Sequence, residues 1–190
     1  MNPALVSSKR MDWCTPENVL ELVRQVGPIA LDPCTNYLNP VHAETFCADA
    51  ASDCEAFGTL VARDGLTYNW SGFPGLVYVN PPYGRQIPRW VDKCIQEADK
   101  GAEILLLVPA RTDTRWFDRL VNSANSTAFW KGRMTFENGD PAALNRHVYW
   151  HEKKQAWVPM DPAPFPTLLA YWGRRDLTFH NVFVPFANIW

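Results

Sequence analysis

Continuous apolar runs and helically spaced apolar stripes alternate along the chain. Residues 76–79 (Leu-Val-Tyr-Val) and 104–108 form two uninterrupted apolar runs, which are typical of strands buried on both faces of a sheet. Shorter or mixed apolar segments at 29–31, 126–136 and 167–172 predict further strands.

Helical spacing appears between these runs. Apolar residues at 19, 22, 23 and 26 follow Thr15-Pro16, which offers an N-cap hydroxyl and a proline at the first helical position. Similar stripes at 90–98 and 116–121 predict two more helices. The repeated order of strand, turn and helix predicts an α/β fold with a mostly parallel sheet flanked by helices.

Three segments lack a clear period. Residues 1–11 are predicted to be a flexible N-terminal arm preceding one domain over 12–190, since 190 residues suit a single core. Residues 40–63 are ambiguous, with some helical character expected. Residues 138–166 hold many prolines, and we predict a long loop or flap there.

Composition narrows the class of protein. The chain is 47% hydrophobic, and it contains no apolar run long enough for a membrane span and no secretion signal, so a cytoplasmic enzyme is expected. Its five cysteines include no CxxC pair and are interpreted as reduced thiols. His147 and His151 are spaced four apart but lack companion ligands, and no metal is predicted.

The overall charge gives little support to tight binding of nucleic acid. The formal net charge is −2 and the pI is about 6.1. Proteins that hold duplex DNA through many phosphate contacts are usually basic. A local basic patch would therefore have to supply any such contact, and Arg85, Arg89, Lys131, Arg146, Lys153 and Lys154 are candidates for it.

Two of the predicted strands end in unusual polar sequences. The first runs into Asp32-Pro33-Cys34, and the strand at 76–79 runs into Asn80-Pro81-Pro82-Tyr83. Ligands of open α/β sheets bind outside the carboxyl ends of the strands. We therefore expect the functional site at this edge.

The sequence Asn80-Pro81-Pro82-Tyr83 suits chemistry on an aromatic amine. The Asn80 amide oxygen and the Pro81 carbonyl, which the prolines keep out of the sheet, would each accept one N–H of the amine. They would thereby orient the nitrogen lone pair and stabilise the positive charge that develops on it. Tyr83 offers a face on which a base can stack. The plainer alternative is a sharp turn with an aromatic plug.

Several ordered segments resemble the phage-type Dam DNA N6-adenine methyltransferases, from Trp13 to about Trp172. The shared pattern comprises Asp12–Pro16, Leu31–Cys34 with Asn39, Asp64–Leu66 with Trp70, Val79–Tyr83, Leu107–Asp113 with Trp116-Phe117, Gly132–Phe136 and Pro164–Pro166. The resemblance implies a Rossmann-like class I methyltransferase domain that uses S-adenosyl-L-methionine as cofactor and DNA as substrate.

The resemblance also implies residue roles. Catalysis would fall to Asn80, Pro81, Pro82 and Tyr83. The cofactor would be bound by Trp13, Thr15, Pro16, Asp32, Pro33, Cys34, Asn39, Asp64 and Leu66. Backbone N–H groups at the start of the first helix would hold the cofactor carboxylate. Arg111 and Arg133 would contact the substrate. The glycine-rich loop of many methyltransferases is missing after Asp32, and the choice of ribose-contacting acid among Asp49, Asp53 and Glu55 stays open.

The sequence therefore favours a methyltransferase that acts on the N6 amine of adenine in DNA, with the target base flipped out of the helix. Cytosine N4, RNA adenine and a protein glutamine amide are alternative acceptors for the same chemistry. A non-catalytic nucleic-acid-binding module with the same fold is a further alternative. The DNA recognition sequence and the oligomeric state do not follow from the sequence.

Overall fold

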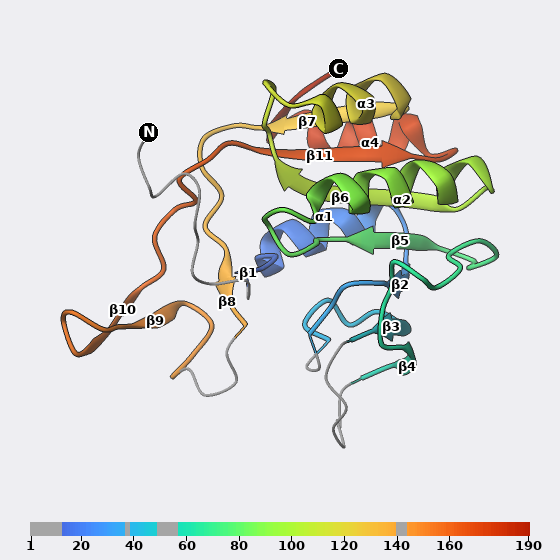
Figure 1. The fold of residues 1–190 in the computed structure, drawn as a ribbon. Helices are drawn as coiled ribbons and strands as arrows, with labels where there is room; N and C mark the ends of the chain where they lie inside the picture. The colour runs from blue at the N-terminus through green and yellow to red at the C-terminus, as the bar shows by residue number, and fades with distance from the viewer. Residues whose placement is uncertain (1–12, 37–38, 49–56, 140–143) are drawn as a thin grey trace.

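The computed structural model describes residues 13–36, 39–48, 57–139 and 144–190 (Figure 1). The predicted arm at 1–11 lies outside them. The elements in chain order are β1 (Trp13–Cys14), α1 (Glu17–Val26), β2 (Ile29–Asp32), β3 (Thr45–Cys47), β4 (Thr59–Ala62), β5 (Leu76–Val79), α2 (Ile87–Asp99), β6 (Glu103–Pro109), α3 (Arg115–Ser123), β7 (Ser126–Trp130), β8 (Glu137–Asn138), β9 (Val148–His151), β10 (Ala156–Pro159), β11 (Thr167–Trp172), α4 (Asp176–Phe183) and β12 (Ala187–Ile189).

An eight-stranded sheet in the order β12-β7-β11-β6-β5-β2-β3-β4 forms the centre of the molecule. The pairs from β4 across to β6 are parallel, whereas β11 is antiparallel to both of its neighbours, β6 and β7. Strand β12 is antiparallel to β7. The prediction of a mixed α/β fold with a mostly parallel sheet is confirmed.

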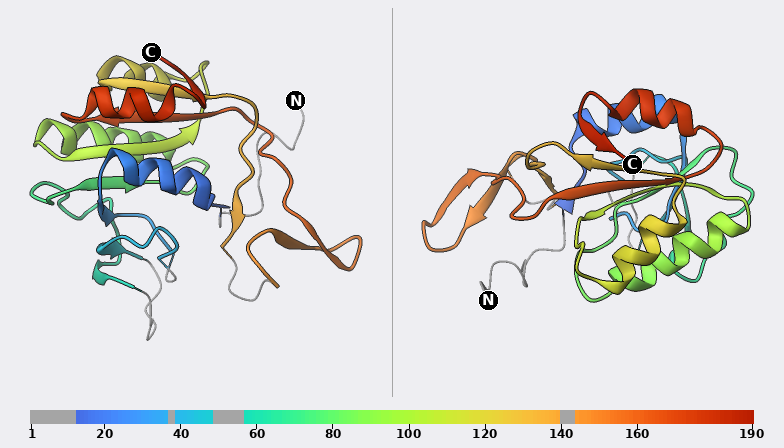
Figure 2. Two further views of the ribbon diagram at one scale, coloured as in Figure 1. Left: turned by 180° about the vertical axis from the view of Figure 1, so that it is seen from behind. Right: turned by 90° about the horizontal axis from the view of Figure 1, so that it is seen from above.

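Helices cover both faces of the sheet (Figure 2). Alternate residues of each central strand point to opposite faces. Leu76 and Tyr78 of β5 pack with α1 and α4, while Val77 and Val79 pack with α2 and α3. Every residue of β2, β5 and β11 is buried, which explains why the central strands have continuous apolar sequences.

The start of α1 differs from the prediction. The helix begins at Glu17, Pro16 occupies the N-cap position, and no side chain caps the helix from there. The Thr15 hydroxyl, predicted to cap this helix, is bonded elsewhere. The Glu137 carboxylate instead accepts a hydrogen bond from the Glu17 N–H at 3.2 Å. This acid comes from β8, which pairs with β1.

Two of the aperiodic segments contain strands. Residues 40–63 were expected to be partly helical, but their described part forms β3 and β4 and contains no helix. The strand expected at 126–136 ends at Trp130. Residues 138–166, predicted as a long loop or flap, include the hairpin of β9 and β10, which stands out from the body in Figure 1.

Candidate active site

The direction in which successive strands are added to the sheet reverses between β2 and β5. The chain passes from β2 to β3 and β4 on one side, and from β5 to β6 on the other. This reversal is a topological switch point, at which the carboxyl ends of neighbouring strands leave a crevice for ligands. The sequences that follow β2 and β5 begin with Pro33 and Asn80, so the structure brings together the two segments that the sequence had singled out.

The Asn80 side chain is fixed by hydrogen bonds on one side only. Its amide nitrogen donates to the carbonyl of Trp13 at 2.9 Å and to the hydroxyl of Thr15 at 3.2 Å. Its oxygen is buried and has no hydrogen-bond partner among the described residues. An unsatisfied buried acceptor costs about 1–3 kcal/mol. The amide is therefore held with an unused acceptor, as expected for a group that receives a ligand N–H.

Tyr78 belongs to the same network. The oxygen atoms of its hydroxyl and of the Thr15 hydroxyl are 2.7 Å apart. The resulting buried chain runs from Tyr78 through Thr15 to Asn80. In the sequence, Tyr78 is one member of the apolar run at 76–79. The hydroxyl of Tyr78 was the only feature that could have indicated its place in this network, because a buried tyrosine hydroxyl usually has a hydrogen-bond partner.

Tyr83 lies at the boundary between the two hydrophobic cores. Its ring makes edge-to-face contacts with Phe136 and Phe165 at centroid distances of 5.7 and 5.6 Å. Its hydroxyl is buried without a partner among the described residues, and burial raises the pKa of Tyr83 well above its ordinary value. Tyr83 as a whole residue is half-buried, so the proline-rich turn is not packed wholly inside the core.

A pocket of about 630 Å³ lies beside Pro82, at the ends of β2 and β3 and the start of α2. It is lined by Pro33, Cys34, Thr35, Cys47, Arg63, Asp64, Gly65, Leu66, Pro82, Gly84, Arg85, Gln86, Arg89 and Trp90. Four of the predicted cofactor residues, Pro33, Cys34, Asp64 and Leu66, thus line one cavity. Cys47, Arg63 and Trp90 were not predicted there, and the Trp90 indole N–H is buried without a partner among the described residues.

The Asp64–Leu66 turn is held tightly against the segment after β2. Asp64 accepts a hydrogen bond from the Leu66 N–H at 2.9 Å. A Cβ atom at Gly65 would lie only 1.8 Å from the Pro33 carbonyl oxygen, so this close approach requires glycine. The Trp70 indole donates to the Gly65 carbonyl at 2.9 Å, and the fully buried Glu97 accepts from the Trp70 N–H. These hydrogen bonds of Trp70 hold the Asp64–Leu66 turn in place as one wall of the pocket.

Asp32 ends β2 with its side chain almost fully buried, at 3% exposed. Its carboxylate accepts a hydrogen bond from the Cys34 N–H at 3.0 Å. No ion pair within the described residues includes Asp32. Burial raises the pKa of Asp32 to about 7, although the bond from Cys34 opposes the shift. A carboxylate poised in this way responds strongly to a nearby positive charge.

Five predicted cofactor residues do not line the pocket beside Pro82: Trp13, Thr15, Pro16, Asp32 and Asn39. Asn39 is fully buried and has a positive φ of 43°. Its amide donates to the carbonyls of Ala43 and Phe57 and accepts from the Ala43 N–H. The two bonds with Ala43 organise the local turn, and the bond to Phe57 ties this turn to a segment further along the chain.

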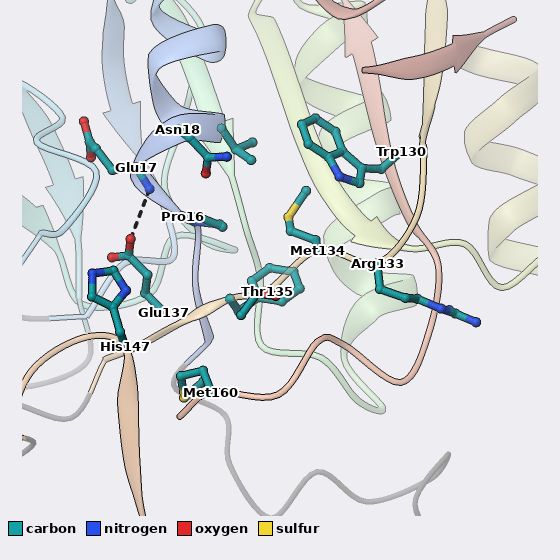
Figure 3. Close-up of a pocket in the computed structure, with 12 residues that line it drawn as sticks. Pro16, Glu17, Asn18, Trp130, Arg133, Met134, Thr135, Glu137, His147 and Met160 are labelled. Carbon is teal, nitrogen blue, oxygen red and sulfur yellow. Dashed lines mark hydrogen bonds between the residues drawn. The ribbon is translucent and has the colours of Figure 1, made fainter. Parts of the chain in front are cut away.

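A second pocket, of about 640 Å³, opens beside the start of α1 (Figure 3). It is lined by Pro16, Glu17, Asn18, Val19, Trp130, Arg133, Met134, Thr135, Phe136, Glu137, His147 and Met160. The backbone N–H groups at the start of this helix were expected to hold the cofactor carboxylate. The Glu17 N–H instead points at Glu137 and is not free for that role. Arg133 is exposed and extends away from His147 and Glu137.

The remaining predicted residues are placed as follows. Trp13 packs edge-to-face on Phe136 and supplies the carbonyl that holds Asn80. Arg111 lies half-buried, two residues after the end of β6. The acids Asp49, Asp53 and Glu55, considered for ribose contact, lie outside the described residues. Cys14, Cys34, Cys47 and Cys94 are free thiols.

The sequence model of the DNA N-6-adenine-methyltransferase (Dam) family matches residues 4–149, which is most of the chain. The chain belongs to this family. It is therefore an enzyme that methylates adenine at N6 in DNA, as the resemblance predicted. A comparison with curated proteins gave no match.

In the described part of the chain, no helix is long and apolar enough to cross a membrane. Within the same ranges, no three His, Cys, Asp or Glu side chains gather in a way that could hold a metal ion.

Proposed function

We propose that this enzyme binds S-adenosyl-L-methionine beside Pro33 and Asp64 and presents a flipped-out adenine to it at Asn80. The buried, unpartnered oxygen of Asn80 carries this proposal. That oxygen is preset to accept one hydrogen of an exocyclic amine, and the Pro81 carbonyl, which follows the end of β5, would accept the other. The amine would then be held by two acceptors before reaction.

The pocket residues fit the proposed cofactor. Exposed Asp64 would accept a hydrogen bond from the adenine amino group of the cofactor, while Leu66 and Trp90 offer apolar surface for the ring. Gly65 permits the close approach of the two segments that form the wall. Asp32 supplies a negative charge behind Pro33 for a cationic ligand. The cofactor, when bound, supplies an electrophilic methyl group on a sulfonium.

The residues of the chain would act mainly by positioning and by charge stabilisation. Accepting both N–H hydrogens turns the nitrogen lone pair out of conjugation with the ring, and the amine becomes a better nucleophile. The same two oxygens stabilise the positive charge that builds on the nitrogen. No general base with a matched pKa is required, because the methylated ammonium is strongly acidic and releases its proton readily.

Base flipping follows from the depth of the site. The Asn80 oxygen is buried, and an amine inside a duplex stack would not reach it, so the target base must leave the helix. The ring of the half-buried Tyr83, braced by Phe136 and Phe165, would provide a surface for stacking the flipped base. Stacking of this kind is worth about 1–3 kcal/mol.

The strand order also supports a more specific proposal, that the fold is a Rossmann-like class I methyltransferase fold. Five parallel strands surround a switch point between β2 and β5, and the candidate site lies at that point. Binding at the switch point is the general rule for doubly wound sheets.

The acceptor is tested by incubating the full chain with labelled S-adenosyl-L-methionine and a mixture of DNA, RNA and protein. We expect label in DNA, released on digestion as N6-methyladenine. Label in N4-methylcytosine, in RNA adenine or in glutamine would replace the proposed acceptor by that one. No binding of the cofactor by calorimetry would instead favour a non-catalytic module of the same fold.

Tyr78→Phe is expected to lower the turnover number several-fold while leaving cofactor affinity unchanged. The substitution removes only the hydroxyl that contacts Thr15, and loss of one such bond costs about 1 kcal/mol. Asn80 would then be less firmly oriented. Single-turnover kinetics and calorimetry measure the two effects.

A double-mutant cycle separates positioning from general destabilisation. If Tyr78 acts through Asn80, Tyr78→Phe should have no further effect on turnover in an Asn80→Ala background. Thr15→Ser keeps the intervening hydroxyl and should remain close to wild type. Equal effects of Tyr78→Phe in both backgrounds would show that Tyr78 has only a structural role.

A further inference from the structure

In the described part of the chain, the hydrogen bonds that join the β9–β10 hairpin to the rest of the enzyme lie at its base, and the hairpin has no core of its own. In Figures 1 and 2 it projects away from the sheet and its covering helices. No residue between 144 and 160 is buried. A two-stranded hairpin of this kind is only marginally stable by itself in water. Its exposed surface is therefore suited to contact with another molecule.

Aromatic side chains occupy both faces of the hairpin. Trp150 and Trp157 are directly opposite in the strand register, and their rings meet edge-to-face at 5.8 Å. Each of these tryptophans is 36% exposed. On the other face, Tyr149 stacks on His151 at 5.9 Å. Exposed, preformed aromatic pairs are the side chains on which nucleic-acid bases stack.

The charge of the hairpin is opposite to that of the rest of the chain. Residues 144–160 contain Arg146, Lys153 and Lys154 against the single acid Glu152, a net charge of +2. Arg146 pairs with Glu137 of β8 at 3.6 Å, which leaves the two lysines as the basic groups of the turn. The other residues hold fifteen lysines and arginines against nineteen acids, a net charge of −4. Asp161 lies at the base and accepts a hydrogen bond from the Tyr149 hydroxyl. On net charge, a polyanion would thus be drawn more strongly to the hairpin than to the body as a whole.

The base of the hairpin is connected to the candidate active site. The Asn138 side chain donates to the Val148 carbonyl at 2.9 Å. Asn138 pairs in turn with Trp13 across β8 and β1, and the Trp13 carbonyl holds the Asn80 amide. The hairpin also stands on the side of the molecule where β5 and β6 end (Figure 1). A ligand on the hairpin would therefore lie on the side of the molecule at which β5 ends and the segment from Asn80 begins.

We propose that the β9–β10 hairpin is the DNA-binding arm of this enzyme. Lys153 and Lys154 at its turn contact phosphates, and Trp150 and Trp157 stack on bases beside the flipped adenine. The inference rests on the proposed function for its choice of partner. It also explains how an acidic protein engages DNA, because the basic contacts are concentrated on one projecting element.

Binding of a fluorescein-labelled, mixed-sequence duplex to the full chain at several salt concentrations tests the proposal. Lys153→Gln/Lys154→Gln should weaken binding and reduce the slope of log affinity against log salt by about 2. Trp150→Ala should weaken binding roughly tenfold. Both lysines are exposed at the turn, so their replacement should leave folding unchanged.

Matched controls lie on other parts of the surface. Arg174→Gln removes an exposed charge that follows β11, and Trp190→Ala removes the most exposed tryptophan. Both should bind DNA like wild type, and all variants should keep the same affinity for S-adenosyl-L-methionine.

The DNA-binding measurement does not depend on methyl transfer. Unchanged DNA binding in the hairpin variants would overturn the inference even if the enzyme methylates DNA as proposed. Failure of the wild-type chain to bind DNA would overturn it as well. If Trp150→Ala changed only the sedimentation of the protein, the surface would belong to an interface between two copies of the chain. Selective loss of DNA binding in the hairpin variants would support the inference even if another acceptor proved to be the true one.

Discussion

Asn80→Ala is expected to lower the turnover number for DNA methylation by about 10²–10³-fold, the usual effect of removing one preorganised polar group from a developing charge. The affinity for S-adenosyl-L-methionine should stay near the wild-type value, because Asn80 does not line the pocket assigned to the cofactor. Single-turnover rates and calorimetry on the same preparations give both quantities.

The stability of this variant carries additional information. Alanine loses the two hydrogen bonds that the Asn80 amide nitrogen donates to Trp13 and Thr15. It also removes a buried oxygen that has no partner. These changes offset each other, so we expect a small shift in Tm despite the large loss of turnover. Such a result is typical of residues that are retained for function at some expense of stability.

Asn80→Asp is the matched control. It preserves an acceptor oxygen at the same position but loses the donor that holds the side chain against Trp13 and Thr15. Partial turnover, well above that of Asn80→Ala, is therefore expected. If Asn80→Ala abolished cofactor binding as strongly as it abolished turnover, Asn80 would belong to the cofactor site and the two assigned roles would be reversed.

The central strands and the site motif were predictable because burial on both faces leaves a clear pattern in the sequence. Strands β5, β6 and β11 are continuous apolar runs. Two prolines after Val79 forced the chain out of the sheet at a place that the rule for open α/β sheets already marks as functional. The location of Asn80 therefore followed from local sequence and one topological rule.

The peripheral elements gave no comparable pattern. Strands β3, β4 and β12 are only three or four residues long, which is too short for a period to be recognised. Both faces of the β9–β10 hairpin lie in solvent, so its sequence does not alternate between apolar and polar residues. Helix α4 was not predicted; its exposed Leu177 interrupts the contrast between a buried and a solvated face.

The connections within the site depend on residues far apart in the chain. Thr15 looked like a helix cap because a proline follows it, but its hydroxyl bonds to Tyr78, 63 positions away. Asn39 had a family-like position, yet its amide is used for the local turn. Competition between local capping and a tertiary hydrogen bond is decided by packing, and no periodicity in the sequence reports its outcome.

Asp32 is expected to make cofactor binding depend on pH. Burial raises the pKa of Asp32 to about 7 in the free enzyme. A cationic cofactor favours the ionised carboxylate, so below this pKa a proton must leave when the cofactor binds. The affinity for S-adenosyl-L-methionine should therefore rise up to tenfold per pH unit below about pH 7 and level off above it. Calorimetry over a range of ~3 pH units, from about pH 5.5 to about pH 8.5, covers both sides of the Asp32 pKa and measures this dependence.

Asp32→Asn should remove this pH dependence and weaken cofactor binding most strongly at pH values above the Asp32 pKa. Asp64→Asn also changes a carboxylate near the proposed cofactor, but Asp64 is exposed and its replacement should retain the slope. A slope that persists unchanged in Asp32→Asn would assign the titration to another group and remove Asp32 from the cofactor site.

The stability of the free enzyme should change with pH in the opposite direction. Because the pKa of Asp32 is raised from 3.8 to about 7 on folding, the folded state binds more protons than the unfolded state between these values. The contribution of Asp32 to the free energy of unfolding therefore falls as pH rises through this window. Asp32→Asn removes the buried charge, so it should raise Tm at pH 8 while it weakens cofactor binding. The presence of an ionised aspartate that destabilises the free enzyme is thus best explained by a positively charged ligand that binds beside it. A Tm of Asp32→Asn below that of the wild type at pH 8 would contradict this explanation.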